Sequence, residues 1–362
     1  MLAARRLITA LSFSLALVPA WAAVVEPVMD PALVEKADHA VDQGLKYLRG
    51  TQAENGSWSK SVGLTALVLR AFLESPQGFN EKKDDFMARA VTFVVDHARP
   101  DGAIGESDHD LSYNTSVAMV ALQATKNPAY ADVIEKAQRF LVGYQTDEGD
   151  GVKPGEKYYG GFGFQGDERP DLSNTYLVLE SLKATDFDPG DPLWQKATAF
   201  VSSVQNNSET NHADWAGNDG GFTYSPGYNP YGGTGSHGGM TSAGLLALLF
   251  AGVDRNDPRI QSAYRWIQAN YTLDTNPGTT GNAAQYYYYN VFSKAMAAYG
   301  QPAVVDTAGN SHNWRNALVA KRVGLQDADG SWVNKQSKRW WEGDPNLCTA
   351  WSLIALERAL EK

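Results

Sequence analysis

The sequence predicts an all-α fold, an (α/α)6 toroid of six inner and six outer helices. Six helix-like segments each lead through a turn or loop into a second helix-like segment, and most of these turns place an aromatic or aliphatic residue just after glycine. Such a repeat predicts units that cover one another's apolar faces. Both ends of the chain carry a complete unit, which favours a closed ring, because an open array needs polar caps.

The first segment of each unit is expected to be an outer helix. Several end in a shared pattern of Ala, an apolar pair and Gln, most clearly at 137–145 and 197–205. The six segments cover residues 33–51, 86–99, 133–145, 193–205, 260–271 and 314–326. The stretches at 149–159 and 206–219 are interpreted as insertions at the rim of the ring.

Turns follow five of the outer segments, at 56–58, 102–104, 161–163, 221–222 and 330–332, whereas the fifth unit has Gln285 and four tyrosines instead. The second segments start in a common register set by Thr65, Thr115, Thr175, Thr241 and Thr349, with Tyr289 in the fifth unit. A threonine so early in a helix can satisfy a free backbone N–H. Residues 240–253 are apolar almost all the way round, which predicts an inner helix surrounded by protein.

Residues 1–22 are expected to be a cleavable signal peptide. Arg5 and Arg6 precede an apolar run at 7–18 that is too short to span a membrane, and Ala20-Trp21-Ala22 ends it in a small-x-small pattern. We therefore predict one toroid domain over residues 23–362. It would be exported, to the periplasm or beyond the cell, with no integral membrane span after signal cleavage.

The charge of the chain argues against nucleic acid as a partner. The chain has 41 acidic and 31 basic residues, and loss of residues 1–22, which hold two Arg, leaves a net charge of −12. So acidic a surface disfavours nucleic acid and anionic membranes. Cys348 is the one cysteine of the sequence, so the core must hold the fold without disulfides. The oligomeric state is left open.

The glycine turns, each followed by a Thr-initiated apolar helix, resemble the repeats shared by squalene and oxidosqualene cyclases and protein prenyltransferase β subunits. The resemblance covers residues 33–362, and RPDLSNT at 169–175 and EGDPNL at 342–347 resemble an exported bacterial branch of that family in particular. It implies an α/α toroid built from six prenyltransferase/squalene-oxidase-like repeats.

The family's acid motif is incomplete in this chain. Class II terpene cyclases carry Asp-x-Asp-Asp-Thr before an inner helix, and its central Asp protonates the substrate. The nearest match here begins at Asp171, but Ser173 stands in the place of the central acid; the run from Asp110 departs further, by one inserted residue. The resemblance makes Asp171 and Asp110 candidate catalytic residues.

Protein prenyltransferases bind zinc through Asp-x-Cys and a His before inner helices, and the resemblance raises the same possibility for Asp344, Cys348 and His237. A catalytic zinc needs about three protein ligands and an open position. Because Asn346 occupies the expected Asp position two residues before Cys348, we expect neither a metal site nor any other cofactor. His237 and Asp344 remain candidate catalytic residues.

The loops before the inner helices should gather at one end of the ring, the mouth, if all inner helices run the same way. The candidate ligand-binding residues there are aromatic or basic: Tyr231, Tyr287, Tyr288, Arg339, Trp340 and Trp341. Four consecutive tyrosines cannot all face one way on a helix, so one or two should line the cavity. The alternative is structural, since Asp often caps helices and aromatic residues often fill turns.

Three functions fit these observations. The main hypothesis is an apolar, isoprenoid-like ligand in an aromatic central cavity, where π faces could stabilise carbocations. If the protein is an enzyme, it would then act as a terpene cyclase, isomerase or transferase. One alternative is a non-catalytic binding or assembly scaffold of the envelope. Another is a carbohydrate-active (α/α)6 enzyme, which would need two carboxylates about 5–10 Å apart.

Overall fold

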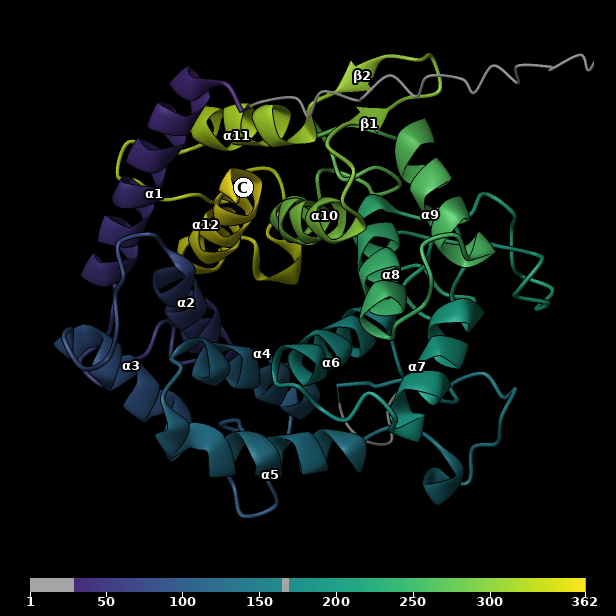
Figure 1. Ribbon diagram of the computed structural model, residues 1–362, viewed down its shortest axis with the longest axis horizontal. Coiled ribbons are helices and arrows are strands. Elements are labelled where there is room, and N and C mark those ends of the chain that lie inside the picture. Colours follow the sequence, from purple (N-terminus) through teal and green to yellow (C-terminus); the bar gives the residue numbers. More distant parts are fainter. Residues whose placement is uncertain (1–28, 165–168, 362) are drawn as a thin grey trace, which may run out of the picture.

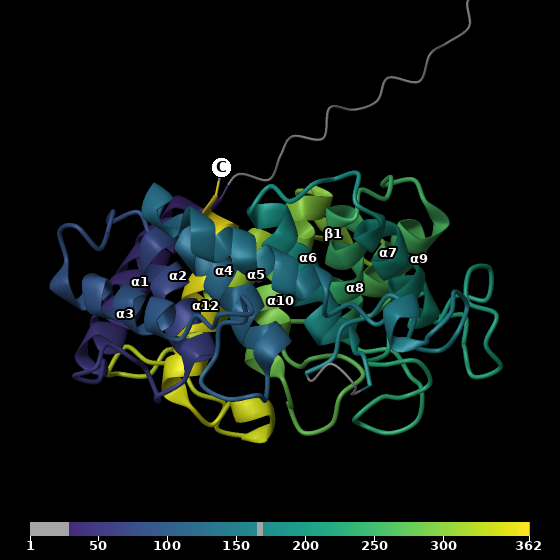
Figure 2. The same cartoon turned by 90° about the horizontal axis from the view of Figure 1, so that it is seen from below.

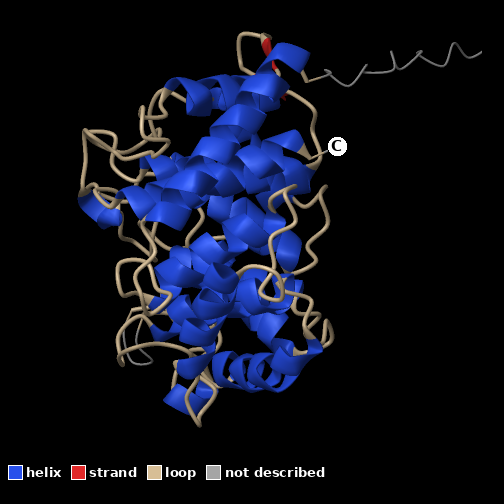
Figure 3. Ribbon diagram, turned by 90° about the vertical axis from the view of Figure 1, so that its left-hand side faces the viewer, coloured by secondary structure: helices blue, strands red, loops and turns tan. Residues whose placement is uncertain are grey.

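The structure of the protein, a computed structural model, describes residues 29–164 and 169–361. The predicted signal peptide lies outside these residues. Figure 1 shows two concentric rings of helices, and Figure 3 shows how little of the described chain is strand. The predicted toroid of six inner and six outer helices is confirmed.

The outer ring consists of α1 (Pro31–Gly50), α3 (Asp85–Asp96), α5 (Ala131–Val142), α7 (Pro192–Ser203), α9 (Pro258–Ala269) and α11 (Trp314–Gly324). The inner ring consists of α2 (Val62–Glu74), α4 (Leu111–Ala124), α6 (Leu172–Ala184), α8 (Gly238–Phe250), α10 (Gln285–Tyr299) and α12 (Pro345–Leu360). Short elements lie in the connections: the 3-10 helices η1 (Pro128–Tyr130), η2 (Glu148–Asp150) and η3 (Arg339–Trp341), and the antiparallel strands β1 (Val304–Val305) and β2 (Ser311–His312).

The ring is closed. Each inner helix packs against two inner neighbours, and α12 returns to α2. The outer ring closes where α1 packs against α11. The helix predicted to be surrounded by protein is α8, in which residues 238–248 are buried. Closure buries the apolar faces that the end units of an open array would expose.

Asp-Pro pairs start several helices. Asp30, Asp191, Asp257 and Asp344 each accept a hydrogen bond from the backbone N–H two residues on, and proline follows each of them at the first helical position. Proline there costs no hydrogen bond, because the first N–H of a helix has no intrahelical partner. These local signals set where three outer helices and one inner helix begin.

One hydrogen bond joins the turn to the inner helix in five of the six units. The turn residue with the buried side chain donates its backbone N–H to the hydroxyl of the register threonine. Trp58 donates to Thr65 in this way and Trp332 to Thr349, both at 3.0 Å. The same bond occurs at Ile104–Thr115, Phe162–Thr175 and Phe222–Thr241. The threonines therefore satisfy a free N–H as predicted, but that N–H belongs to the turn and not to the helix end.

A glutamine joins each of four units to the next. Gln326 Nε2 donates to Gly330 O of its own turn and to Ala40 O of α1, at 2.9 and 2.8 Å. Gln52, Gln145 and Gln205 make the equivalent bonds to their turn and to the next outer helix. These glutamines lie just beyond their helices, so the outer helices end one to three residues before the predicted ends.

The turn glycine is required by both its backbone and its surroundings. Gly56, Gly102, Gly160, Gly220 and Gly330 have φ between 83° and 96°, and a Cβ on any of them would meet a backbone carbonyl of the next outer helix. Hence the third turn is centred on Gly160 and Gly161 rather than on residues 161–163. Only glycine adopts such a φ without strain and leaves room for that carbonyl.

The fifth unit is built differently. Its tyrosine run does not form a turn but begins α10, and Tyr289 OH donates to Leu273 O at 2.8 Å where the other units use a threonine. Figure 2 shows the segments before α10 and α12 on the lower side of the ring, opposite the C-terminus. The loops before the inner helices thus share one side, which is the predicted mouth.

We predict that Gly330→Ala destabilises the protein by at least about 2 kcal/mol, because a side chain at this φ is strained and its Cβ would lie 2.5 Å from Gln43 O at the closure of the ring. Chemical denaturation measures the loss. Gly324→Ala is the matched control, since nothing lies within 4 Å of its Cβ position. Equal stability of the two variants would contradict the closure contact.

Candidate functional site

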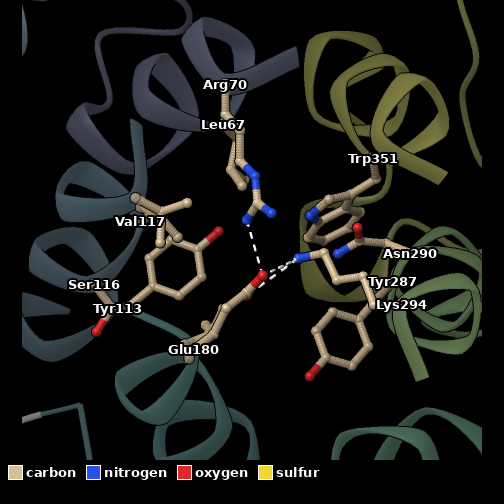
Figure 4. A pocket seen from close by; sticks show the side chains of 12 residues that line it. Leu67, Arg70, Tyr113, Ser116, Val117, Glu180, Tyr287, Asn290, Lys294 and Trp351 are labelled. Atoms are coloured by element: carbon tan, nitrogen blue, oxygen red, sulfur yellow. Dashed lines mark hydrogen bonds and ion pairs between the residues drawn. The ribbon is translucent and has the colours of Figure 1, made fainter. Parts of the chain in front are cut away.

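A cavity of about 20 Å³ lies at the centre of the inner ring, room for about one or two water molecules. Five of the six inner helices line it (Figure 4). Its wall consists of Leu67, Arg70, Tyr113, Ser116, Val117, Val120, Leu177, Glu180, Tyr287, Asn290, Lys294 and Trp351. Most of these side chains are apolar or aromatic, and three are charged.

The three charged side chains meet across the ring. Arg70 Nη1 lies 3.0 Å from Glu180 Oε1, and Lys294 Nζ lies 2.9 and 3.1 Å from the two oxygens of Glu180. They come from α2, α6 and α10, alternate helices of the inner ring. We call these three residues the axial triad. It joins three helices that are not neighbours, so it fixes their separation across the ring.

The charges of the axial triad shift one another's pKa values. Burial alone would raise the pKa of Glu180, but Lys294 and Arg70 outweigh it and hold that pKa well below its usual value. Burial, reinforced by Arg70, lowers the pKa of Lys294 to about 8. Tyr176 OH donates to Glu180 Oε2 at 2.8 Å. Glu180 is therefore an ionised carboxylate with fully engaged oxygens, unsuited to donating a proton.

The triad continues toward the C-terminal ends of the inner helices. Arg70 Nε lies 2.7 Å from Glu74, and Arg358 of α12 lies 3.0 Å from the other oxygen of that carboxylate. Glu357 lies beside this group, buried, and neither of its carboxylate oxygens has a partner among the described residues. Burial, with nearby Glu74, raises the pKa of Glu357 well above its usual value.

Sequence reasoning missed the axial triad, although the register contains it. Arg70, Glu180 and Lys294 each lie five residues after the register residue of the first, third and fifth units. The same position in the other units holds Val120, Leu246 and Ile354. A charged residue inside an apolar helix is expensive unless it is paired, so its recurrence at one position in alternate units was a detectable signal.

Asp171 is a buried helix cap behind the cavity wall. It accepts hydrogen bonds from the backbone N–H and the side-chain amide of Asn174, at 2.9 and 2.7 Å, and from the Tyr224 hydroxyl. Burial raises its pKa to about 6. Ser173, in the place of the family's acid, shares a 3.1 Å hydrogen bond with Tyr287 OH. Asp171 thus reaches the cavity only through neighbours.

The other candidate acids lie in loops before inner helices. Asp344 caps α12 and accepts a hydrogen bond from Ser59 at 2.6 Å. Asp110 precedes α4 in a left-handed conformation, with φ 59°. Neither residue is among those that line the cavity. The three candidate aspartates are therefore not brought together at the ring centre.

His237 precedes α8 and is buried. Its ring meets Tyr231 edge-on at 5.2 Å between centroids, and neither ring nitrogen has a partner among the described residues. Burial lowers its pKa to about 3. Cys348 Sγ instead contacts Glu342 O at 3.3 Å. Within residues 29–164 and 169–361, no three His, Cys, Asp or Glu side chains are grouped so that they could hold a metal ion.

The tyrosine run divides as its periodicity requires. Tyr287 lines the cavity. Tyr288 points away and donates to Thr272 O at 2.9 Å. Tyr286 and Tyr289 flank the buried guanidinium of Arg322, at 4.4 and 4.5 Å from their ring centroids. One tyrosine of the four therefore lines the cavity, and the other three pack against neighbouring parts of the protein.

The remaining candidates form a bridge over the mouth. Arg339 lies 5.0 Å from the ring centroids of both Tyr231 and Trp340, and Trp340 Nε1 donates to Tyr231 OH at 3.0 Å. Trp340 also stacks on Tyr224 at 6.2 Å. Trp341 is 82% exposed. These residues do not line the central cavity; they fasten the segment before α12 to the loop before α8.

Glu342 follows Trp341 in the chain and joins this segment to the start of α10. Its carboxylate accepts the N–H groups of Gln285, Tyr286 and Tyr287 at 2.6–2.9 Å, and the Asn334 amide at 2.6 Å. It therefore caps α10, whose own N-cap residue, Ala284, has no side chain to do so. Burial raises the pKa of Glu342 to about 7, against these hydrogen bonds, which favour the carboxylate.

No family model and no curated protein sequence matches the chain. Solved structures do match its fold. The type II terpene cyclase MstE from Scytonema, in complex with merosterolic acid A, matches at a TM-score of 0.57 and 12% identity, over 91% of this chain and 98% of that one. A protein from Actinoplanes matches at 0.57 and 16% identity, over 90% and 100%.

An inactive variant of an alpha-1,6-mannanase from Salegentibacter matches equally well, at a TM-score of 0.58 and 11% identity, over 89% of this chain and 98% of that one. Identities this low show a shared fold and no more. They confirm that the chain is a toroid of the kind found in terpene cyclases and in glycosidases.

We predict that Glu180→Gln destabilises the protein by about 3–5 kcal/mol, because it leaves two buried cations without their shared carboxylate. Denaturation of Glu135→Gln is the control; that residue pairs with Arg139 on the surface and should cost under about 1 kcal/mol. The depressed pKa adds a pH test. The carboxylate's stabilisation is full above pH 4.5 and is lost as the pH falls further, so wild type should lose more stability in acid than Glu180→Gln.

We also predict that Glu342→Ala costs about 1–3 kcal/mol, because three N–H groups at the buried start of α10 lose their acceptor. Hydrogen exchange should then show faster exchange of the amides of residues 285–287. Glu54→Ala, at an exposed site, is the control. Unchanged exchange at those three amides would show that the cap is dispensable.

Proposed function

We propose that this protein binds a ligand with an apolar, isoprenoid-like body in the central cavity. The supporting observation is the cavity wall. Leu67, Val117 and Leu177 line it together with the rings of Tyr113, Tyr287 and Trp351. Pockets for small molecules are mostly apolar and aromatic, with a few convergent polar groups, and this cavity has that composition.

The size of the cavity sets a condition on binding. At about 20 Å³ it admits water but not a chain of isoprene units. Entry of such a ligand therefore requires side chains of the wall to move. Tyr287 and Tyr113 are only partly buried, and Tyr287 OH is held by its hydrogen bond to Ser173. Rotation of these two rings toward the mouth would lengthen the cavity.

We propose binding without proton-initiated cyclisation. That reaction needs a carboxylic acid held protonated against the substrate. Among the described residues that line the cavity, Glu180 is the one carboxyl group, and two cations keep it ionised. Asp171, with a pKa of about 6, caps α6 and is not among the residues that line the cavity.

A saccharide-binding toroid is the second candidate, and the mouth favours it. Trp340, Trp341 and Tyr228 are exposed there, with Arg339 beside Trp340 and Arg169 over Tyr228. Exposed aromatic faces beside donors suit stacking on sugar rings. Hydrolysis of a saccharide would need two carboxyl groups close together that are free to act on the glycosidic bond. Asp171 and Asp344 are instead engaged as helix caps.

We further propose that the protein works outside the cytoplasm, in the periplasm or as a secreted protein, within the exported bacterial branch that its repeats resemble. The signal-like segment at 1–22 supports this. In the described part of the chain, no helix combines the length and apolarity needed to cross a membrane.

We predict that purified protein titrated with geranylgeraniol, a 20-carbon isoprenoid alcohol, binds it, and that Val117→Phe weakens binding at least about tenfold, because the added ring fills the cavity. Isothermal titration calorimetry measures both. Val305→Phe, at the exposed residue of β1, is the matched control and should bind as wild type does.

Two results would contradict the proposal. Absence of binding by wild type, with no isoprenoid recovered by mass spectrometry from solvent extracts of the purified protein, would favour a non-catalytic scaffold. Binding of mannose oligosaccharides that Trp341→Ala abolishes and Val117→Phe does not would favour the saccharide-binding candidate.

A further inference from the structure

We propose that the mouth of the ring binds an acidic saccharide, one whose sugar rings carry carboxylates, along a row of aromatic rings and two guanidinium groups. We call this set the mouth row; it consists of Arg169, Tyr228, Tyr224, Trp340, Arg339 and Tyr231. None of these residues lines the central cavity, so the site is separate from the proposed isoprenoid site. It rests on the second candidate, saccharide binding at the mouth, and specifies the charge of that saccharide.

The mouth row is continuous. The guanidinium of Arg169 lies over the ring of Tyr228, 4.8 Å from its centroid. The ring of Tyr224 lies 6.5 Å from that of Tyr228 and 6.2 Å from that of Trp340. Arg339 follows, 5.0 Å from the Trp340 ring. The segments before α6, α8 and α12 therefore contribute to one surface.

Exposed apolar side chains gather at this surface. In the described part of the chain, five large hydrophobic side chains are exposed. Three of the five are Tyr228, Trp340 and Trp341, of which the first two belong to the mouth row and the third follows it in the chain. Single exposed hydrophobic residues need no explanation, whereas a group of them on one surface marks a binding site.

The backbone of Trp340 and Trp341 is strained. Their φ angles are 60° and 64°, in the left-handed region that destabilises residues other than glycine. Stacking on Tyr224 and a hydrogen bond to Tyr231 hold the ring of Trp340. The side chain of Trp341 makes no ring contact or hydrogen bond with any residue that the structure describes, and it is 82% exposed. Packing therefore does not account for this conformation, which presents the Trp341 ring to the solvent.

The two guanidinium groups keep donors free for a ligand. Neither Arg169 nor Arg339 forms an ion pair with a described residue, and Arg339 uses only Nη2 among its side-chain donors, for Pro230 O. A guanidinium that lies over a ring leaves its N–H edge accessible, and that edge matches the two oxygens of a carboxylate. The carboxylates closest in the chain, Asp171 and Glu342, are buried and engaged as helix caps.

This combination favours a saccharide over a lipid surface. Aromatic faces that are already fixed can stack on sugar rings, while the neighbouring N–H groups reach hydroxyl and carboxylate oxygens. A short saccharide would contact the mouth row alone. An anionic membrane would meet the whole face of a chain whose net charge is strongly negative, and charges act over about 10 Å at 0.1 M salt.

A matched pair of probes tests the charge of the ligand: the tetramer of galacturonic acid, and the same tetramer with its carboxylates methyl-esterified. Isothermal titration calorimetry at neutral pH and low salt should show the acid binding at least about tenfold tighter than the ester. Raising the salt from about 50 mM to about 500 mM should remove most of this preference, because it screens exposed charges.

Two variants test the guanidinium groups. Arg169→Gln and Arg339→Gln should each reduce the preference for the acid at least about threefold and leave the affinity for the ester unchanged. Arg255→Gln is the matched control, with the same loss of charge. Arg255 follows α8, on the side of the ring away from the mouth, and like Arg339 it donates to a carbonyl, Ala298 O at 3.0 Å. This variant should keep the full preference.

Trp341→Gly tests the ring that the strained backbone presents. It should weaken binding of both tetramers about tenfold, because stacking does not depend on the charge of the sugar. It should also unfold at the same denaturant concentration as wild type or a higher one, since glycine adopts this φ without strain. A marked loss of stability with unchanged binding would show that Trp341 only packs, and would overturn its role in recognition.

The remaining outcomes separate this site from the proposed functions. Equal affinity for acid and ester, or a preference that survives in both arginine variants, would overturn the acidic saccharide and leave a saccharide-binding mouth. Binding to phosphatidylglycerol vesicles without binding to either tetramer would overturn it in favour of a lipid surface. If nothing binds at the mouth, the inference fails, and titration of the same samples with geranylgeraniol still decides the isoprenoid site.

Discussion

Closure of the ring is the constraint on which the rest of the structure depends. Each inner helix is covered only because the next unit is present, and the last unit must meet the first. The contact that achieves this is the one used at four other places: a glycine in the left-handed region lets its turn lie against a carbonyl of the next outer helix. At the closure that pair is Gly330 and Gln43, supported by the hydrogen bond from Gln326 to Ala40.

Closure of the ring also brings together the residues that line the central cavity. Positions that are equivalent in the repeat point at one another only when the units form a ring. The position five residues after the register residue does so, and three of its six occurrences are charged. In an open array, Arg70, Glu180 and Lys294 would be separate buried charges at high cost. In the ring they pair with one another at the end of the cavity beyond its apolar wall.

The toroid itself does not specify a reaction. Terpene cyclases and glycosidases share it with this chain at identities of 11–12%, so function must be argued from the cavity and the mouth. Most of the candidate residues at the mouth have a structural role. Asp171 and Asp344 cap the helices that follow them, and Glu342 caps α10 from another segment. Arg339 and Trp340 join the segment before α12 to the loop before α8. The cavity, with one ionised carboxylate among its described residues, is better suited to holding a ligand than to protonating one.

The repeat, the toroid and the starts of most helices were predictable from the residues, because they arise from local chemistry. An Asp-Pro pair caps a helix, a Gly-x-aromatic turn reverses the chain, and an apolar run with no polar face must be surrounded. The candidate site was predictable only in part. Tyr287 could be expected near the cavity from its place before an inner helix, whereas Trp340 and Trp341 from a similar place lie over the rim. Which of two neighbouring side chains faces the axis depends on the rotation of each helix in the ring, and packing against both neighbours sets that rotation. The pairing of Arg70, Glu180 and Lys294 likewise joins residues 110 or more positions apart, and no local rule relates such residues until the ring brings them within hydrogen-bonding distance.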